Sequence, residues 1–109
     1  MLSIAQIEDR LLQLPNLISD AEQSEWRLAL DVKTAEEGLK SREADLLTGT
    51  ELTGKNAETR KAELHNETRR ERRNLVEAEG KLDWQRINTR ALQAEFKAYQ
   101  SLCRIRGAE

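Results

Sequence analysis

One stretch of the chain has glycines and a lysine at the spacing of a phosphate-binding loop. Gly49 and Gly54 enclose four residues, and Lys55 follows directly. A nucleotide-hydrolysing loop needs Ser or Thr after that lysine to hold magnesium, and it needs a β-strand before it. Asn56 follows the lysine, and residues 39–47 continue a helical pattern. We therefore interpret the stretch as a turn and expect no enzyme activity, no catalytic residues and no cofactor.

A second chemically suggestive feature is a cluster of bases. Arginine side chains bind phosphate by charge and by bidentate hydrogen bonds, so the cluster could contact nucleic acid. The candidate residues are Lys55, Arg60, Arg69, Arg70, Arg72 and Arg73. The alternative is a solvated helix face whose arginines pair with the acids of residues 19–47 and with Glu67 and Glu77. No aromatic platform for unstacked bases lies nearby, so nucleic-acid binding is the less favoured interpretation.

Metal and disulfide chemistry lack the residues they need. His65 is the only histidine and Cys103 the only cysteine, so we expect no metal site and no internal disulfide. Of the 109 residues, 35% are charged and 4% are aromatic, and the net charge is −2. The sequence lacks an apolar run that could span a bilayer and a signal-peptide pattern at its start. We expect one domain over residues 1–109, a cytoplasmic location and no membrane partner.

The sequence predicts that the segments carrying these candidate residues are helices. Ser3 and Gln6 have the spacing of a capping box, and Pro15 predicts a break or kink. Ser19 and Glu22 repeat the capping pattern. We therefore predict helices over 3–14 and 19–47, a loop over 48–55 with a reversal near Thr50, and one long helix over 56–106 that Asn56 caps.

Both halves of the chain carry an apolar stripe with alternating steps of three and four residues. On the long helix, the stripe consists of Leu64, Thr68, Glu71, Leu75, Ala78, Leu82, Gln85, Thr89, Leu92, Phe96, Tyr99 and Cys103. This spacing is the heptad signature of a coiled coil. If the loop reverses the chain, facing residues have numbers that sum to about 103. We call the line of contact between the two apolar stripes the seam. We expect Leu28, Leu75, Leu92 and Phe96 to be its main packing residues. The N-terminal segment either extends this hairpin or folds back as a third helix.

A second apolar stripe occupies the C-terminal half of the long helix. We expect this stripe to lie beside the main stripe and to widen the apolar face of the helix. The candidate interface residues are Trp84, Ile87, Ala91, Ala94 and Ala98, and Ile105 continues the series. Trp26 is expected just off the seam, like Trp84. A hairpin with one thin seam is marginally stable, so we expect a second copy of the chain to cover this stripe. Another protein is the alternative occupant.

The junction between loop and helix, Thr53-Gly54-Lys55-Asn56-Ala57-Glu58, resembles that of small coiled-coil proteins encoded by bacteriophages and prophages. About 55 residues take part in this likeness. The resemblance implies an accessory or modulator of DNA metabolism, or an inhibitor of a host enzyme, in the host cytoplasm. It implies no catalytic residue.

The sequence as a whole predicts an all-α antiparallel coiled-coil hairpin, with a Pro-interrupted N-terminal helix and one long C-terminal helix. We expect it to act through protein–protein contact, with itself and with an unidentified protein. Nucleic-acid binding through Arg69–Arg73 is the alternative.

Overall fold

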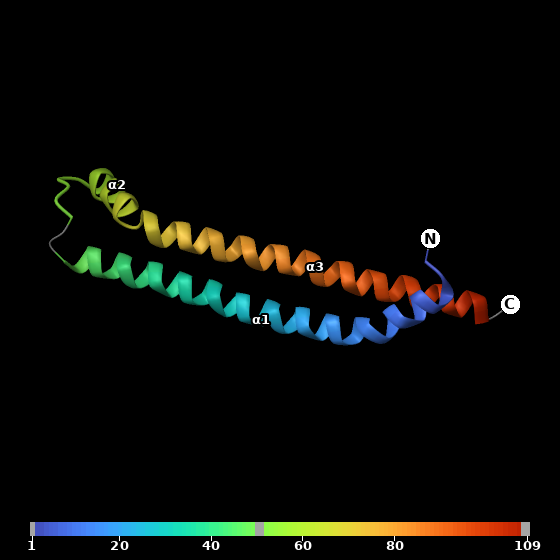
Figure 1. The fold of residues 1–109 in the computed structure, drawn as a ribbon. Coiled ribbons are helices and arrows are strands. Elements are labelled where there is room, and N and C mark those ends of the chain that lie inside the picture. The colour runs from blue at the N-terminus through green and yellow to red at the C-terminus, as the bar shows by residue number, and fades with distance from the viewer. Residues whose placement is uncertain (1, 50–51, 108–109) are drawn as a thin grey trace. The chain divides into compact units, whose positions relative to one another are not determined.

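The structure, a computed structural model, is an all-α helical hairpin (Figure 1). It describes residues 2–49 and 52–107. Three helices follow one another: α1 (Ile4–Thr48), α2 (Ala57–Glu67) and α3 (Arg69–Gly107). The chain divides into two compact units. The terminal unit joins Met1–Arg27 to Asp83–Glu109, and the loop unit is Leu28–Leu82. In each unit, α1 runs antiparallel to the returning chain.

The start of α1 has the capping box that the sequence predicts. The Gln6 amide donates to Ser3 Oγ at 3.2 Å, and the Ser3 amide donates to Gln6 Oε1 at 2.8 Å. Pro15 lies inside α1 instead of ending it. The separate helices predicted over 3–14 and 19–47 are therefore one helix, and the capping box at Ser19 does not form. Pro15 removes a single backbone donor, and the N-terminal part of α1 bends (Figure 1).

The long helix predicted over 56–106 is divided at Thr68. Asn56 caps α2 as expected, since its Oδ1 accepts the Thr59 amide at 2.8 Å. Thr68 is 1% exposed, and its hydroxyl donates to the Leu64 carbonyl at 2.8 Å. The side chains of Thr68 and Arg72 also donate to the His65 carbonyl. Side chains that bind helix carbonyls in this way bend a helix, which accounts for the division between α2 and α3.

The loop between α1 and α2 packs closely against the start of α2. The Thr53 amide donates to Glu63 Oε2 at 2.8 Å. A Cβ atom placed on Gly54 would lie 2.8 Å from the Arg60 nitrogen, so only glycine fits there without a shift. Helix α1 ends at Thr48 and α2 begins at Ala57, which agrees with the predicted loop over 48–55. The predicted reversal at Thr50 lies outside the described residues.

The side chains of the predicted seam are buried or half-buried in both units. All twelve stripe residues from Leu64 to Cys103 are buried or half-buried. The stripe of α1 is buried or half-buried at Ile7, Leu11, Leu14, Ile18, Ala21, Glu25, Leu28, Val32, Ala35, Leu39, Arg42 and Leu46. Leu14 and Leu46 are fully buried, whereas Ile4 is 47% exposed. The residues expected to hold the seam, Leu28, Leu75, Leu92 and Phe96, are only half-buried. A two-helix seam leaves one flank of each such side chain near solvent.

The pairing register differs from the predicted sum of 103. In the loop unit, Arg42 pairs with Glu67, whereas the rule places residue 61 opposite it. In the terminal unit, Ile7 lines a hollow with Leu102 and Cys103, whereas the rule places residue 96 opposite it. These two differences are six or seven residues, close to one heptad, whereas the Arg10–Glu95 ion pair departs from the rule by only two residues. A shift by one heptad superimposes the stripe on itself, so the pattern alone does not distinguish the two registers.

Candidate protein-interaction surface

The five predicted interface residues lie together on one exposed face of α3, inside the terminal unit. Trp84 is 71% exposed and Ile87 is 57% exposed, and the three alanines are exposed as well. Ile105, 61% exposed, continues the same face toward the end of α3. We call this set the outer face: Trp84, Ile87, Ala91, Ala94, Ala98 and Ile105.

The outer face does not lie beside the seam, and that part of the prediction is wrong. Each of its residues follows a seam residue by two positions, as Trp84 follows Leu82 and Ala91 follows Thr89. At about 100° per residue, two positions turn the helix by roughly 200°. The stripe is therefore nearly opposite the seam, which is why Leu82 is 7% exposed and Trp84 is 71% exposed.

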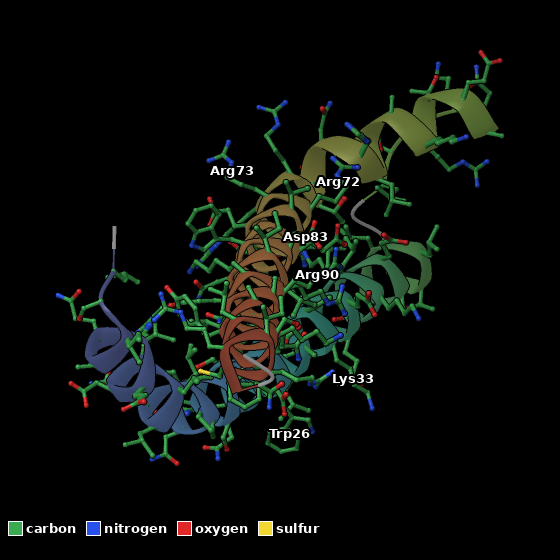
Figure 2. The ribbon with its side chains drawn as sticks, turned by 90° about the vertical axis from the view of Figure 1, so that its right-hand side faces the viewer. Trp26, Lys33, Arg72, Arg73, Asp83 and Arg90 are labelled. Atoms are coloured by element: carbon green, nitrogen blue, oxygen red, sulfur yellow. The ribbon has the colours of Figure 1, made fainter. Side chains whose placement is uncertain are left out.

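The outer face also has residues along its margins that the sequence analysis missed. Leu102 is 47% exposed at one margin, and the bases Arg90, Lys97 and Arg104 follow one another every seven residues along the other. Their heptad spacing is the signal that would have found them. Arg90 lies on the same side of α3 as Asp83, seven residues before it (Figure 2).

A bidentate ion pair between Arg10 and Glu95 joins α1 to α3 within the terminal unit. Arg10 Nε donates to Glu95 Oε1 at 2.6 Å, and Arg10 Nη2 donates to Glu95 Oε2 at 3.1 Å. Arg10 holds the pKa of Glu95 below its ordinary value, against the opposing effect of burial. The same hydrogen bond raises the pKa of Arg10. Glu95 directly follows Ala94, so the pair fixes one margin of the outer face.

Trp26 projects from α1 on the side away from the α3 ribbon (Figure 2), and it is 66% exposed. Its neighbours in a shallow hollow, among them Ser19 and Glu22, all come from α1 itself. The Trp26 side chain is therefore more exposed than we expect for a residue just off the seam. No residue of α3 lines that hollow.

The structure does not gather the six predicted nucleic-acid residues on one face. Lys55 lies in the loop, Arg60 lies on α2, and four arginines follow on α3. Arg72 contacts the His65 ring and carbonyl, while Arg73 points to another side of α3 (Figure 2). Arg69 donates to the Asn66 amide oxygen at 3.4 Å.

Within the described ranges, no group of three or more His, Cys, Asp or Glu side chains could hold a metal ion. Over the same residues, none of the helices combines the length and apolar character that a membrane crossing requires. Comparison of the chain with protein-family models, with curated proteins and with solved structures gives no match in any of the three.

Proposed function

We propose that this chain is a non-enzymatic protein that acts by protein–protein contact through the outer face of α3. The supporting observation is that two exposed large apolar side chains and three exposed alanines follow one helix face at heptad spacing. Exposed apolar surface that continues along one face is typical of an interaction site.

The same proposal includes the biological setting that the sequence suggests. The hairpin seam is a coiled coil, and the chain is an accessory of phage or prophage origin in the host cytoplasm. It modulates DNA metabolism or inhibits a host enzyme. The resemblance at Thr53–Glu58 supports this setting, and a second copy or another protein occupies the outer face.

A photo-crosslinking amino acid at Ala91 tests the proposal. We expect adducts with protein at Ala91 in the cells that make the chain, and an adduct with the purified chain would identify a second copy as the occupant. The matched control is the same amino acid at Glu77, which lies on the same side of α3 but outside the apolar stripe. The adduct mass separates a second copy from another protein. Adducts at neither position, or equal adducts at both, would show that the outer face is not a contact surface.

A further inference from the structure

The outer face is apolar along only part of α3. The same helix side carries Arg70, Arg73, Glu77 and Gly80 before it reaches Trp84. The seam, in contrast, continues through both stretches with buried or half-buried residues. The hairpin therefore forms in the loop unit without an apolar outer face. The apolar stripe of the terminal unit serves some purpose other than closing the hairpin.

The residue sizes along the outer face suit a second helix. Ala91, Ala94 and Ala98 occupy its middle, and larger side chains stand at its ends. Small side chains allow helix axes to approach to about 8 Å, at the close end of the usual range. Alanine contributes little to transfer into a lipid interface, because its apolar area is small. The middle of the stripe therefore fits a closely packed helix better than a membrane surface.

The charges at the margins indicate which kind of helix fits. Arg90, Lys97 and Arg104 are exposed, and no ion pair joins any of them to another described residue. An opposing helix with acids at its own margins would supply the missing partners.

A second copy of the chain supplies those acids poorly. If two stripes pair antiparallel about their alanines, Arg90 comes near Lys97 of the other copy. Asp83 would come near Arg104 in this arrangement, but Asp83 already pairs with Arg86 at 3.8 Å. If the stripes pair parallel, the opposite margin offers Glu95 as its acid, and Arg10 already binds Glu95.

We infer that the outer face of α3 binds an amphipathic helix of another protein, with small or apolar residues on its contact face and acids at the margin that meets Arg90, Lys97 and Arg104. This inference rests on the proposed function and specifies its partner. The apolar stripe supplies affinity by burial, and the basic margin sets the orientation and the preference for acids.

The test uses the full-length chain and two synthetic helices of four heptads each. Both helices have leucine and alanine at their contact positions, and they carry either glutamate or lysine at the flanking positions. We expect the glutamate helix to bind in a fluorescence anisotropy titration and the lysine helix to bind at least about tenfold more weakly. A variant combining R90E, K97E and R104E should reverse this preference. Circular dichroism should show unchanged helix content.

A matched variant, R70E with R73E, reverses two bases of the same helix side outside the apolar stripe. It should leave the affinity for the glutamate helix unchanged, which separates specific docking from general attraction. Equal binding of both helices, or binding of neither, overturns the inference. A two-chain adduct at Ala91 as the sole product also overturns it in favour of a second copy, but leaves the proposed function standing. Binding of anionic lipid vesicles through Trp84 instead of the glutamate helix overturns it in favour of a membrane.

Discussion

Arg10 and Glu95 show how one pair of side chains couples the two helices of the terminal unit. Arg10 comes from α1 and Glu95 from α3, and both are only partly exposed. Two hydrogen bonds in fork geometry fix their relative position more firmly than a single contact would. Polar residues also enter the seam itself: Thr89 is 3% exposed and donates its hydroxyl to the Gln85 carbonyl at 3.0 Å. That hydrogen bond within the helix makes the burial of the hydroxyl tolerable.

The lowered pKa of Glu95 predicts a loss of stability in acid. Because the carboxyl pKa is lower in the folded chain than in the unfolded one, the pair contributes stability above the unfolded value of about 4.3. That contribution disappears as the pH falls through the folded pKa. We therefore expect Glu95→Gln to lower the urea midpoint at neutral pH and to lose less further stability than the wild type in acid.

Urea unfolding of both proteins at about pH 6 and about pH 3 measures the difference. Glu8→Gln is the matched control, because Glu8 is exposed and no ion pair joins it to a described residue. Parallel curves for the wild type and Glu95→Gln would show that the pair does not contribute.

At the scale of elements, local interactions decide where the helices begin and bend. Ser3 and Asn56 cap α1 and α2, as their side-chain chemistry predicts. Pro15 and Thr68 indicate the helix boundaries less well, because whether each of them bends or ends a helix depends on how the helices pack. Pro15 bends α1 without ending it, and Thr68 divides a stretch that has no helix-breaking residue in its sequence. Tertiary contacts routinely override such propensities.

We expect substitution of glycine by alanine to have opposite effects on the free energy of unfolding at Gly80 and at Gly54. Gly80 is exposed inside α3, and a Cβ there meets nothing within 4 Å. We expect Gly80→Ala to raise the free energy of unfolding by about 0.5–1 kcal/mol, since alanine loses less backbone entropy on folding. Gly54→Ala should lower it, because the new Cβ would lie 2.8 Å from the Arg60 nitrogen. Urea unfolding monitored by circular dichroism measures both. Stabilisation by both substitutions would contradict the close approach of the loop to α2.

At the scale of the molecule, the terminal unit divides its charge between α1 and α3. In the terminal unit, residues 4–27 of α1 carry five acids and two bases, whereas residues 83–107 of α3 carry five bases and two acids. Single pairs of exposed charges contribute little, but segregation of this kind favours the antiparallel pairing throughout the unit. The same division leaves α3 with a basic margin beside its outer face.

Charge segregation predicts that salt destabilises the hairpin. We expect the urea midpoint to fall as sodium chloride rises from about 0.02 M to about 0.3 M, because screening shortens the range of attraction between exposed charges. The double variant Arg10→Gln with Glu95→Gln removes the bidentate pair between α1 and α3 and should keep most of this dependence. A midpoint that rises with salt would mean that repulsion within each helix outweighs attraction between them.

The sequence by itself determined the all-α hairpin, the two caps and the residues of the seam. Those features depend on periodicity and on contacts within one helical turn, which are visible in a linear pattern. It also identified the apolar stripe from Trp84 to Ala98, although not the side of α3 on which the stripe lies.

Only the tertiary structure decided the pairing register, the continuity of α1 through Pro15 and the division at Thr68. A heptad repeat fits its partner equally well after a shift of seven residues, so the path of the loop must select the register. Bending at Pro15 and Thr68 likewise depends on what each side chain contacts after the helices pack. Local pattern and long-range packing therefore determine different parts of this protein.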